Sequence, residues 1–378
     1  MNSPIKYPGG KNNELNVILP NFPKKVNRFF EPFVGGGAVY FNVNEEIPLL
    51  INDKSKELIN FYIQIKNRNN DFLDTLSKIN NTLIFLPKFV NTYKDNLTSI
   101  YQDYKDGNNV SLSDSISEFI NLHISEFKNN IFIYTAKYKD FENQLFKSVF
   151  DKYKRIRNLE NKLGHLKDEN DLIDNITTGF MSAYYTFNRT LFNFPKKYNL
   201  PDSIHASYYF YIREYCYSSM FRYNKDGHFN VPYGGMSYNL KTLSKKICYL
   251  KSDELVNHLQ KTTIKSGDFY EFLSGYELTQ HDFLFLDPPY DTEFSTYANN
   301  TFDVSDQERL AHYLINDCPA KFMLVIKNSE LISRLYTAGT RTLVGNLEVF
   351  EFKKNYLVSF RNRNNKKTSH LLITNYPI

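Results

Sequence analysis

Phe283-Leu284-Phe285-Leu286 runs directly into Asp287-Pro288-Pro289-Tyr290. An apolar run that stops at a polar turn is typical of a buried parallel strand. In an open α/β sheet, ligands bind just beyond the carboxyl ends of such strands. The prolines have fixed φ angles and no N–H donors, so the turn offers a carboxylate, carbonyl acceptors and an aromatic face. That set fits an exocyclic amine on a flat ring, although a plain surface turn is the alternative.

The composition limits the number of domains, the class of partner and the cellular compartment that we expect. With 378 residues, the chain is long enough for one large or two ordinary domains. Its formal charge of +5 permits nucleic-acid binding without demonstrating it. Cys216, Cys248 and Cys318 form no close pair and no metal-ligand spacing, which indicates a reducing, cytoplasmic compartment. Since there is no long apolar run, we expect neither a membrane span nor a signal peptide.

Strand-like runs occur near both ends of the chain, and a long, polar, mostly helical region separates them. The expected strands are residues 28–31, 48–51, 263–264, 283–286, 322–326, 347–350 and 371–374, with helices at about 305–317 and 329–337. We therefore predict an α/β fold whose sheet is built from residues 1–66 and 251–378. Residues 67–250 would form a large, mainly helical inserted module.

A glycine-rich turn, Glu31-Pro32-Phe33-Val34-Gly35-Gly36-Gly37-Ala38, follows the first expected strand. Glycines let the backbone approach a ligand closely, at a helix N-terminus that favours polar groups. Asp53 ends the next strand, where an acid can accept both hydroxyls of a ribose. A tight turn and a helix N-cap are the alternatives for these two features.

Taken in this order, the motifs resemble those of the DNA adenine-N6 methyltransferases of the Dam type, across nearly the whole chain. Tyr7-Pro8-Gly9-Gly10-Lys11 matches the family's first segment, and Phe33-Val34-Gly35-Gly36-Gly37 matches its S-adenosylmethionine loop. Gly267-Asp268-Phe269 matches the segment that contacts the cofactor adenine, and 287–290 the catalytic motif. The fold implied is a Rossmann-like methyltransferase sheet. The resemblance implies cofactor contacts by Tyr7, Lys11, Phe33, Gly35, Gly37, Asp53, Asp268 and Phe269.

The inserted module resembles a target-recognition module that binds double-stranded DNA. The run from Phe187 to Asn193 matches a family motif, but an insertion around Arg213 separates it from the segment that starts at Phe221. The resemblance implies DNA contacts by Arg189, Asn193, Arg213, Arg222 and Asn224. The basic residues of 152–162 are better interpreted as a solvated helix face. A second basic cluster, expected at a hairpin tip, comprises Arg361, Arg363, Lys366 and Lys367.

For the reaction, the resemblance implies methyl transfer from S-adenosylmethionine to N6 of a flipped-out adenine. Asp287 and the Pro288 carbonyl would accept hydrogen bonds from the amine, and Tyr290 would stack on the base. Pro289 completes the motif. No metal is expected, and we expect a monomer, with a dimer as the alternative. A cognate restriction endonuclease would be a genetic partner, and a phage setting is the other possibility.

Two other kinds of function stay open on the sequence: methylation of a different acceptor, and DNA binding without catalysis. Cytosine-N4 methyltransferases share the fold and usually have Ser at the position of Asp287, while glutamine-N5 enzymes have Asn. A catalytically inactive relative that only binds DNA is the non-enzymatic alternative. The order of the motifs, with the glycine loop first and the catalytic motif last, favours adenine, and the intact Asp287 argues against an inactive protein.

Overall fold

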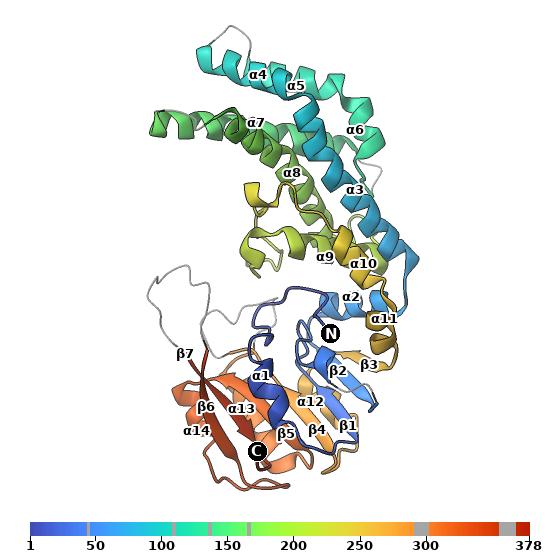
Figure 1. Ribbon diagram of the computed structural model, residues 1–378, viewed down its shortest axis with the longest axis vertical. Coiled ribbons are helices and arrows are strands. Elements are labelled where there is room, and N and C mark those ends of the chain that lie inside the picture. The colour runs from blue at the N-terminus through green and yellow to red at the C-terminus, as the bar shows by residue number, and fades with distance from the viewer. Residues whose placement is uncertain (44–45, 108–110, 135–137, 165–167, 291–301, 355–367) are drawn as a thin grey trace. The chain divides into compact units, whose positions relative to one another are not determined.

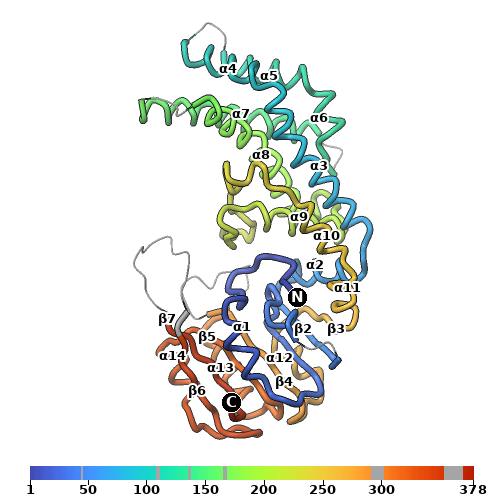
Figure 2. The backbone as a smooth tube through the Cα atoms, in the orientation of Figure 1, coloured from blue at the N-terminus to red at the C-terminus, as the bar shows by residue number. Residues whose placement is uncertain are grey.

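The chain forms two compact units (Figures 1 and 2). The computed structural model describes residues 1–43, 46–107, 111–134, 138–164, 168–290, 302–354 and 368–378, so the basic cluster at 361–367 lies outside the described residues. The sheet unit comprises Met1–Asn67, Phe221–Gly227 and Asp253–Ile378. The helical unit comprises Arg68–Met220 and His228–Ser252.

The sheet unit is built on a seven-stranded mixed sheet with the order β3-β2-β1-β4-β5-β7-β6. The strands from β3 to β5 pair in parallel, and β7 pairs antiparallel with both β5 and β6. The strand bounds are β1 Arg28–Glu31, β2 Leu49–Asp53, β3 Thr262–Ser266, β4 Asp282–Leu286, β5 Lys321–Lys327, β6 Glu348–Lys354 and β7 Thr368–Thr374. The predicted α/β fold is confirmed.

The strand order reverses between β1 and β4, the two central neighbours. In open α/β sheets a ligand crevice forms at such a switch point, beyond the carboxyl ends of the strands. All five residues of β4 are buried, as the apolar run predicted. Phe283 pairs with Phe29 across the β1–β4 register, and Phe22 packs its edge against Phe283 with ring centroids 4.7 Å apart. This aromatic core fixes where the turns after β1 and β4 begin.

The helices of the sheet unit are short; α1 precedes β1, and the others lie between the strands in the sequence (Figure 1). Asp268 caps the N-terminus of α12, and Asp303 forms a capping box with Asp306 at the start of α13. Their bounds are α1 Leu15–Ile18, α2 Lys56–Lys66, α11 Asp253–Gln260, α12 Phe269–Ser274, α13 Val304–His312 and α14 Glu330–Leu335, with short turns η1 Leu19–Asn21, η2 Tyr40–Asn42 and the π-helical η6 Tyr313–Asp317.

The helical unit packs α3, α8 and α9 around a core that is rich in tyrosine. Tyr184, Tyr185 and Tyr211 are fully buried, and the Tyr185 hydroxyl donates to the carbonyl of Val231 over 3.0 Å. The helix bounds are α3 Asn70–Thr92, α4 Lys94–Asp106, α5 Leu112–Leu122, α6 Ile124–Asn130, α7 Tyr138–Leu163, α8 Glu169–Asn193, α9 Asp202–Tyr215 and α10 Ser244–Leu250, with turns η3 Tyr217–Ser219 and η4 Met236–Tyr238. No helix in the described part of the chain is long and apolar enough to cross a membrane.

The segment Phe221–Gly227 does not lie in the unit that its position in the sequence predicted. Phe221–Gly227 belongs to the sheet unit, although residues 67–250 as a whole were expected in the insert. The physical reason is aromatic packing, because the buried Phe221 ring lies 5.0 Å from the Tyr7 ring, centroid to centroid. The expected recognition segment therefore packs on the N-terminal turn of the sheet unit.

An ion pair between neighbouring strands stabilises the sheet. Asp282 is buried and accepts hydrogen bonds from Arg28 Nε and Nη2 over 2.8 and 2.7 Å, and from the Thr279 amide over 2.7 Å. Burial alone raises the pKa of Asp282, but the bonds from Arg28 and Thr279 outweigh it and hold that pKa below its ordinary value.

We expect Asp282→Asn to lower the free energy of unfolding by about 2 kcal/mol, because it leaves Arg28 without its carboxylate partner. A depressed pKa stabilises the fold above the unfolded-state pKa of about 4, and that contribution disappears as the pH falls further. Urea unfolding at pH 7 and pH 3 measures both effects, and the difference between wild type and variant should shrink at pH 3. The exposed Glu277→Gln is the matched control, and equal effects of both substitutions would contradict this account.

Candidate active site

The glycine turn after β1 has a backbone that only glycine adopts easily. Gly35 and Gly37 have φ angles of +49° and +72°, in the left-handed region. A Cβ atom at Gly36 would lie 2.9 Å from the Tyr7 Cβ, and one at Gly37 would lie 2.7 Å from the Phe41 ring. The loop is thus both conformationally restricted and closely packed, so it holds its amides in fixed positions.

Asp53, at the end of β2, accepts hydrogen bonds from this loop. Its Oδ2 accepts from the Gly35 amide over 3.0 Å, and its Oδ1 from the Ser55 amide over 2.8 Å. Burial raises the pKa of Asp53 to about 6, although both amide bonds oppose the shift. Asp53 therefore lies beside the glycine loop, and its carboxyl group changes charge at a pH closer to neutral than an ordinary aspartate does.

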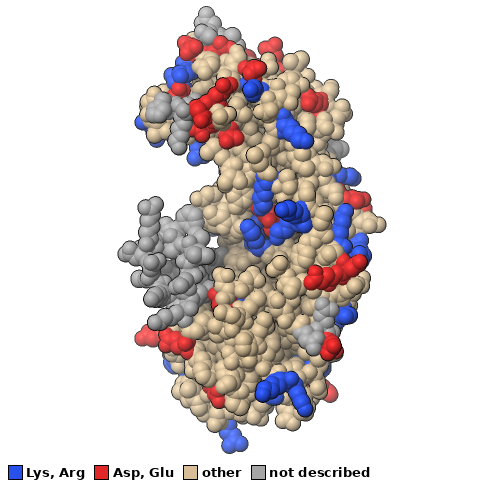
Figure 3. Space-filling model, in the orientation of Figure 1, with Lys and Arg blue, Asp and Glu red and all other residues tan. Residues whose placement is uncertain are grey.

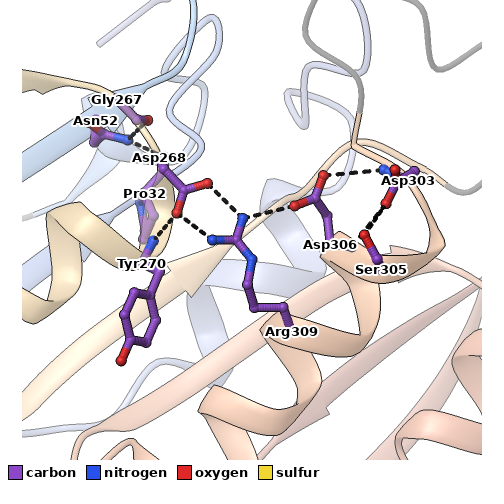
Figure 4. A network of polar contacts seen from close by, with 9 residues as sticks. All are labelled: Pro32, Asn52, Gly267, Asp268, Tyr270, Asp303, Ser305, Asp306 and Arg309. Atoms are coloured by element: carbon purple, nitrogen blue, oxygen red, sulfur yellow. Dashed lines mark hydrogen bonds and ion pairs between the residues drawn. The ribbon is translucent and has the colours of Figure 1, made fainter.

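A third group of candidate cofactor residues surrounds the turn after β3 (Figure 4). Asp268 forms a bidentate ion pair with Arg309, with N–O distances of 2.9 and 2.7 Å. Burial alone would raise the pKa of Asp268, but the hydrogen bonds from Arg309 and the Tyr270 amide hold that pKa below its ordinary value. The Arg309 guanidinium also lies 4.6 Å from the centre of the Phe269 ring. Phe33 packs against Phe269 with centroids 5.5 Å apart.

Two buried polar atoms at these turns make no hydrogen bond to any described residue: Glu31 Oε2 and Asn52 Oδ1. Asn52 uses its amide nitrogen to join the loops, donating to the carbonyls of Pro32 and Gly267 over 3.1 and 2.9 Å. Burial, followed by repulsion from Asp287, raises the pKa of Glu31 well above its ordinary value. A hollow of about 470 Å³, lined in part by Asn52 and Asp268, opens at the same turn. Together these features fit a ligand that donates hydrogen bonds to the two buried oxygens.

The catalytic motif predicted from sequence lies against the N-terminal turn. Lys11, whose side chain is only 2% exposed, forms an ion pair with Asp287. Its ammonium also donates to the Gly9 carbonyl over 3.1 Å and to the Tyr290 hydroxyl over 3.3 Å. The Pro289 carbonyl accepts a hydrogen bond from the side-chain Nε2 of Gln307 over 2.8 Å. Lys11, expected among the cofactor contacts, thus lies at the proposed catalytic carboxylate.

Three of the predicted DNA contacts make internal bonds in the helical unit. Arg189 donates to the Val231 carbonyl over 2.7 Å. Asn193 and the Phe229 backbone exchange two hydrogen bonds, of 2.9 and 2.8 Å. Arg213 is buried at the end of α9, and its guanidinium donates to the Met220 carbonyl over 3.2 Å. These contacts give each of the three a structural role; a DNA contact by any of them stays a prediction.

The other two predicted contacts, Arg222 and Asn224, lie in the segment that packs on the sheet unit. Arg222 is exposed, while the Asn224 side chain accepts from the Asp226 amide over 3.1 Å and closes a turn. In the helical unit, Lys and Arg side chains gather in the region of α9 and α10 (Figure 3). Part of this charge is internally paired, since Lys241 and Lys246 lie 3.1 and 3.5 Å from the carboxylate of the buried Glu214.

Within the described ranges, no three His, Cys, Asp or Glu side chains are grouped so that they could hold a metal ion. The described candidate residues are carboxylates, the buried Lys11 ammonium, the Arg309 guanidinium and aromatic rings at the carboxyl ends of β1 to β4.

Comparison with known families agrees with this arrangement. The profile of the D12 class N6 adenine-specific DNA methyltransferases matches residues 7–169 and 156–349. The chain belongs to this family. Its members generally use S-adenosylmethionine, and the glycine loop, Asp53 and the unpartnered Glu31 oxygen fit that cofactor.

Curated relatives carry names consistent with the family. The type II methyltransferase M.CviBI of Paramecium bursaria Chlorella virus NC1A is 33% identical over 45% of this chain, and the retron Ec67 DNA adenine methylase of Escherichia coli 32% identical over 41%. The chain spans 61% and 51% of these two proteins. The type II methyltransferase M1.LlaDCHI of Lactococcus lactis subsp. cremoris is 23% identical over 98% of this chain and 94% of its own length.

Glu31, Asn52 and Arg309 were not among the site residues predicted from sequence. Glu31 carried a usable signal, because it ends a strand directly before the glycine loop, as Asp53 ends the next strand. Asn52 and Arg309 act through contacts with residues far away in sequence, so the local pattern held no indication of their roles.

The Asn193 contact leads to a test in the helical unit. We expect Asn193→Ala to lower the free energy of unfolding by about 1–2 kcal/mol, because the Phe229 amide and carbonyl lose their partners. Urea unfolding measures this effect. Asn170→Ala, an exposed position in the same helix, is the matched control and should change little. Wild-type stability of Asn193→Ala would show that the Phe229 bonds do not fix this segment.

Proposed function

We propose that the chain methylates N6 of adenine in double-stranded DNA, with S-adenosylmethionine as methyl donor. The observation that carries the proposal is the Asp287 carboxylate, which is held by buried Lys11 beside the Tyr290 hydroxyl at the carboxyl end of β4. It combines a fixed acceptor for an amine with an aromatic face for a base. Family membership selects adenine over cytosine as the proposed target.

S-adenosylmethionine, when bound, supplies an electrophilic methyl group. Asp53 would accept the ribose hydroxyls, beside the glycine loop whose Gly35 amide already donates to it. Glu31 would accept from the ammonium of the methionine part, which would pair its unpartnered oxygen. Phe33 and Phe269 would border the adenine of the cofactor, with Asp268 as acceptor for its exocyclic amine.

Adenine N6 is a poor nucleophile, because its lone pair is delocalised into the ring. Asp287 would accept a hydrogen bond from one N6–H and stabilise the positive charge that develops on nitrogen. The Pro288 carbonyl would accept from the other N6–H, since the Pro289 carbonyl is bonded to Gln307. Lys11 pairs with Asp287, so the incoming amine would share or replace that contact.

The target atom is inaccessible in a stacked duplex, so the base must be flipped out before it reaches Asp287. Unstacking costs roughly a few kcal/mol, and stacking on Tyr290 would offset part of that cost. We propose that the helical unit, together with the exposed Arg222, binds the DNA duplex. Basic side chains would mainly hold phosphates, and a few polar side chains would contact base edges.

The biological setting follows from the relatives only as a proposal. Their names include type II methyltransferases and the DNA N-6-adenine-methyltransferase of Escherichia phage P1. We propose a restriction-modification or phage role, in which any endonuclease is a genetic partner. Sequencing of plasmid DNA from an otherwise unmethylated host that expresses the chain would give the recognition site.

The catalytic role of Asp287 is tested by substitution. We expect Asp287→Asn to slow methyl transfer to a plasmid duplex by about 10²–10³-fold or more, because the neutral amide is a weaker acceptor and Lys11 loses its carboxylate partner. Tritium transfer from labelled S-adenosylmethionine measures the rate, and cofactor binding should stay within a few-fold of wild type. The exposed Glu330→Gln is the control. Full activity of the Asp287→Asn variant would contradict the proposal.

The raised pKa of Asp53 predicts a pH-dependent cofactor affinity. Ribose hydroxyls bind the ionised carboxylate, whose pKa is about 6, so affinity should weaken as the pH falls through that value. Between pH 7.5 and pH 5 the loss should be about tenfold. Calorimetric titration with S-adenosylmethionine measures it. Asp53→Asn should bind weakly at both values, and an unchanged pH dependence in that variant would assign the titration to another group.

A further inference from the structure

His370 lies in β7, and no part of the proposed reaction uses it. Its side chain is fully buried, and its Nε2 lies 3.3 Å from the Tyr290 hydroxyl oxygen. The imidazole also meets the Tyr290 ring edge-on, with centroids 5.5 Å apart at 69°. A buried polar side chain from the C-terminal strand is thus in direct contact with the proposed stacking face of the catalytic motif.

The position of His370 is fixed by its cross-strand neighbours. In the antiparallel registers of β7, His370 lies opposite Lys327 of β5 and Phe352 of β6. Residues directly opposite in such a pair lie on the same face of the sheet. The Phe352 ring lies 5.9 Å from the imidazole, so His370 is packed between two aromatic rings. The β7 backbone and this packing together restrict its side-chain rotation.

The Tyr290 hydroxyl is contacted from two directions in the sequence, by Lys11 near the N-terminus and by His370 near the C-terminus. A protonated lysine only donates, so the hydroxyl oxygen accepts from Lys11. The hydroxyl proton is then available to donate to His370 Nε2. Both separations of 3.3 Å are long, as is common in a site that tightens when substrate enters.

We propose that His370 is a positioning residue for the target base: it fixes the Tyr290 ring by holding its hydroxyl, so that the stacking face is set before the flipped adenine arrives. This inference rests on the proposed function, in which Tyr290 stacks on that base. A preset ring avoids the entropic cost of ordering a side chain during binding, and that saving corresponds to about three- to tenfold in affinity. His370 is not expected to touch the base or the cofactor.

A double-mutant cycle tests the proposal, with the methylation site first mapped by sequencing plasmid DNA. His370→Leu removes the hydrogen bond, Tyr290→Phe removes the hydroxyl but keeps the ring, and the double variant removes both. The readouts are single-turnover methylation of a duplex carrying the mapped site and fluorescence of 2-aminopurine placed at the target position. Fluorescence reports stacking of the flipped base, which a merely structural role would not change selectively.

We expect His370→Leu to lower methylation efficiency about three- to tenfold and to increase 2-aminopurine fluorescence, because stacking is weaker. In the Tyr290→Phe background the same substitution should cost nothing more. Affinity for S-adenosylmethionine should be unchanged, and the exposed His281→Leu should match wild type. If His370→Leu costs as much with Phe at 290 as with Tyr, its effect does not pass through the hydroxyl and the inference is overturned.

A second pair of variants guards against misfolding of His370→Leu. Glutamine places an amide near the position of Nε2, whereas asparagine is too short to reach it. We expect His370→Gln to keep most of the stacking signal and His370→Asn to lose it; equal behaviour of the two would overturn the inference. Wild-type protein that transfers no methyl group to adenine would instead overturn the proposed function, and the inference with it.

Discussion

The buried ammonium of Lys11 lies among the carboxylates at the carboxyl edge of the sheet. Lys11 pairs with Asp287 after β4, and it also lowers the raised pKa of Glu31 after β1. Burying an unpaired charge costs several kcal/mol, so the ion pair with Asp287 stabilises the buried Lys11 ammonium. The pairing holds the proposed acceptor carboxylate in place. A target amine that replaces Lys11 would therefore meet a preformed acceptor.

The same constraint accounts for the N-terminal turn. Lys11 reaches Asp287 only because the preceding turn packs on the glycine loop, where Tyr7 leaves no space for a side chain at Gly36. The Tyr7 ring also packs against the ring of Phe221. The proposed cofactor loop, the proposed catalytic carboxylate and the proposed recognition segment Phe221–Gly227 are therefore connected through the first eleven residues within one compact unit.

The sequence predicted those parts of the site that depend on local pattern. The apolar run before Asp287, the glycine turn and the acid at the end of β2 each lie where strand periodicity placed them, because parallel strands present their carboxyl ends at one edge. Lys11 was identified but assigned to the cofactor, since nothing local shows that its turn folds back onto β4. Arg213 was assigned to DNA from the resemblance, and its burial at the end of α9, where it bonds to Met220, could not be predicted from the local pattern. His370 and Arg309 gave no signal, because their partners are distant in sequence. Long-range packing, rather than propensity, decided each of these.

The central claim is that Asp287 and its surroundings direct a methyl group to the exocyclic amine of adenine. Nucleoside mass spectrometry tests it most directly, on duplex DNA incubated with wild-type protein and S-adenosylmethionine carrying an isotopically labelled methyl group. The account predicts labelled N6-methyladenine as the product and no labelled cytosine. Labelled N4-methylcytosine, or no labelled nucleoside at all from DNA that contains many adenine contexts, would contradict it.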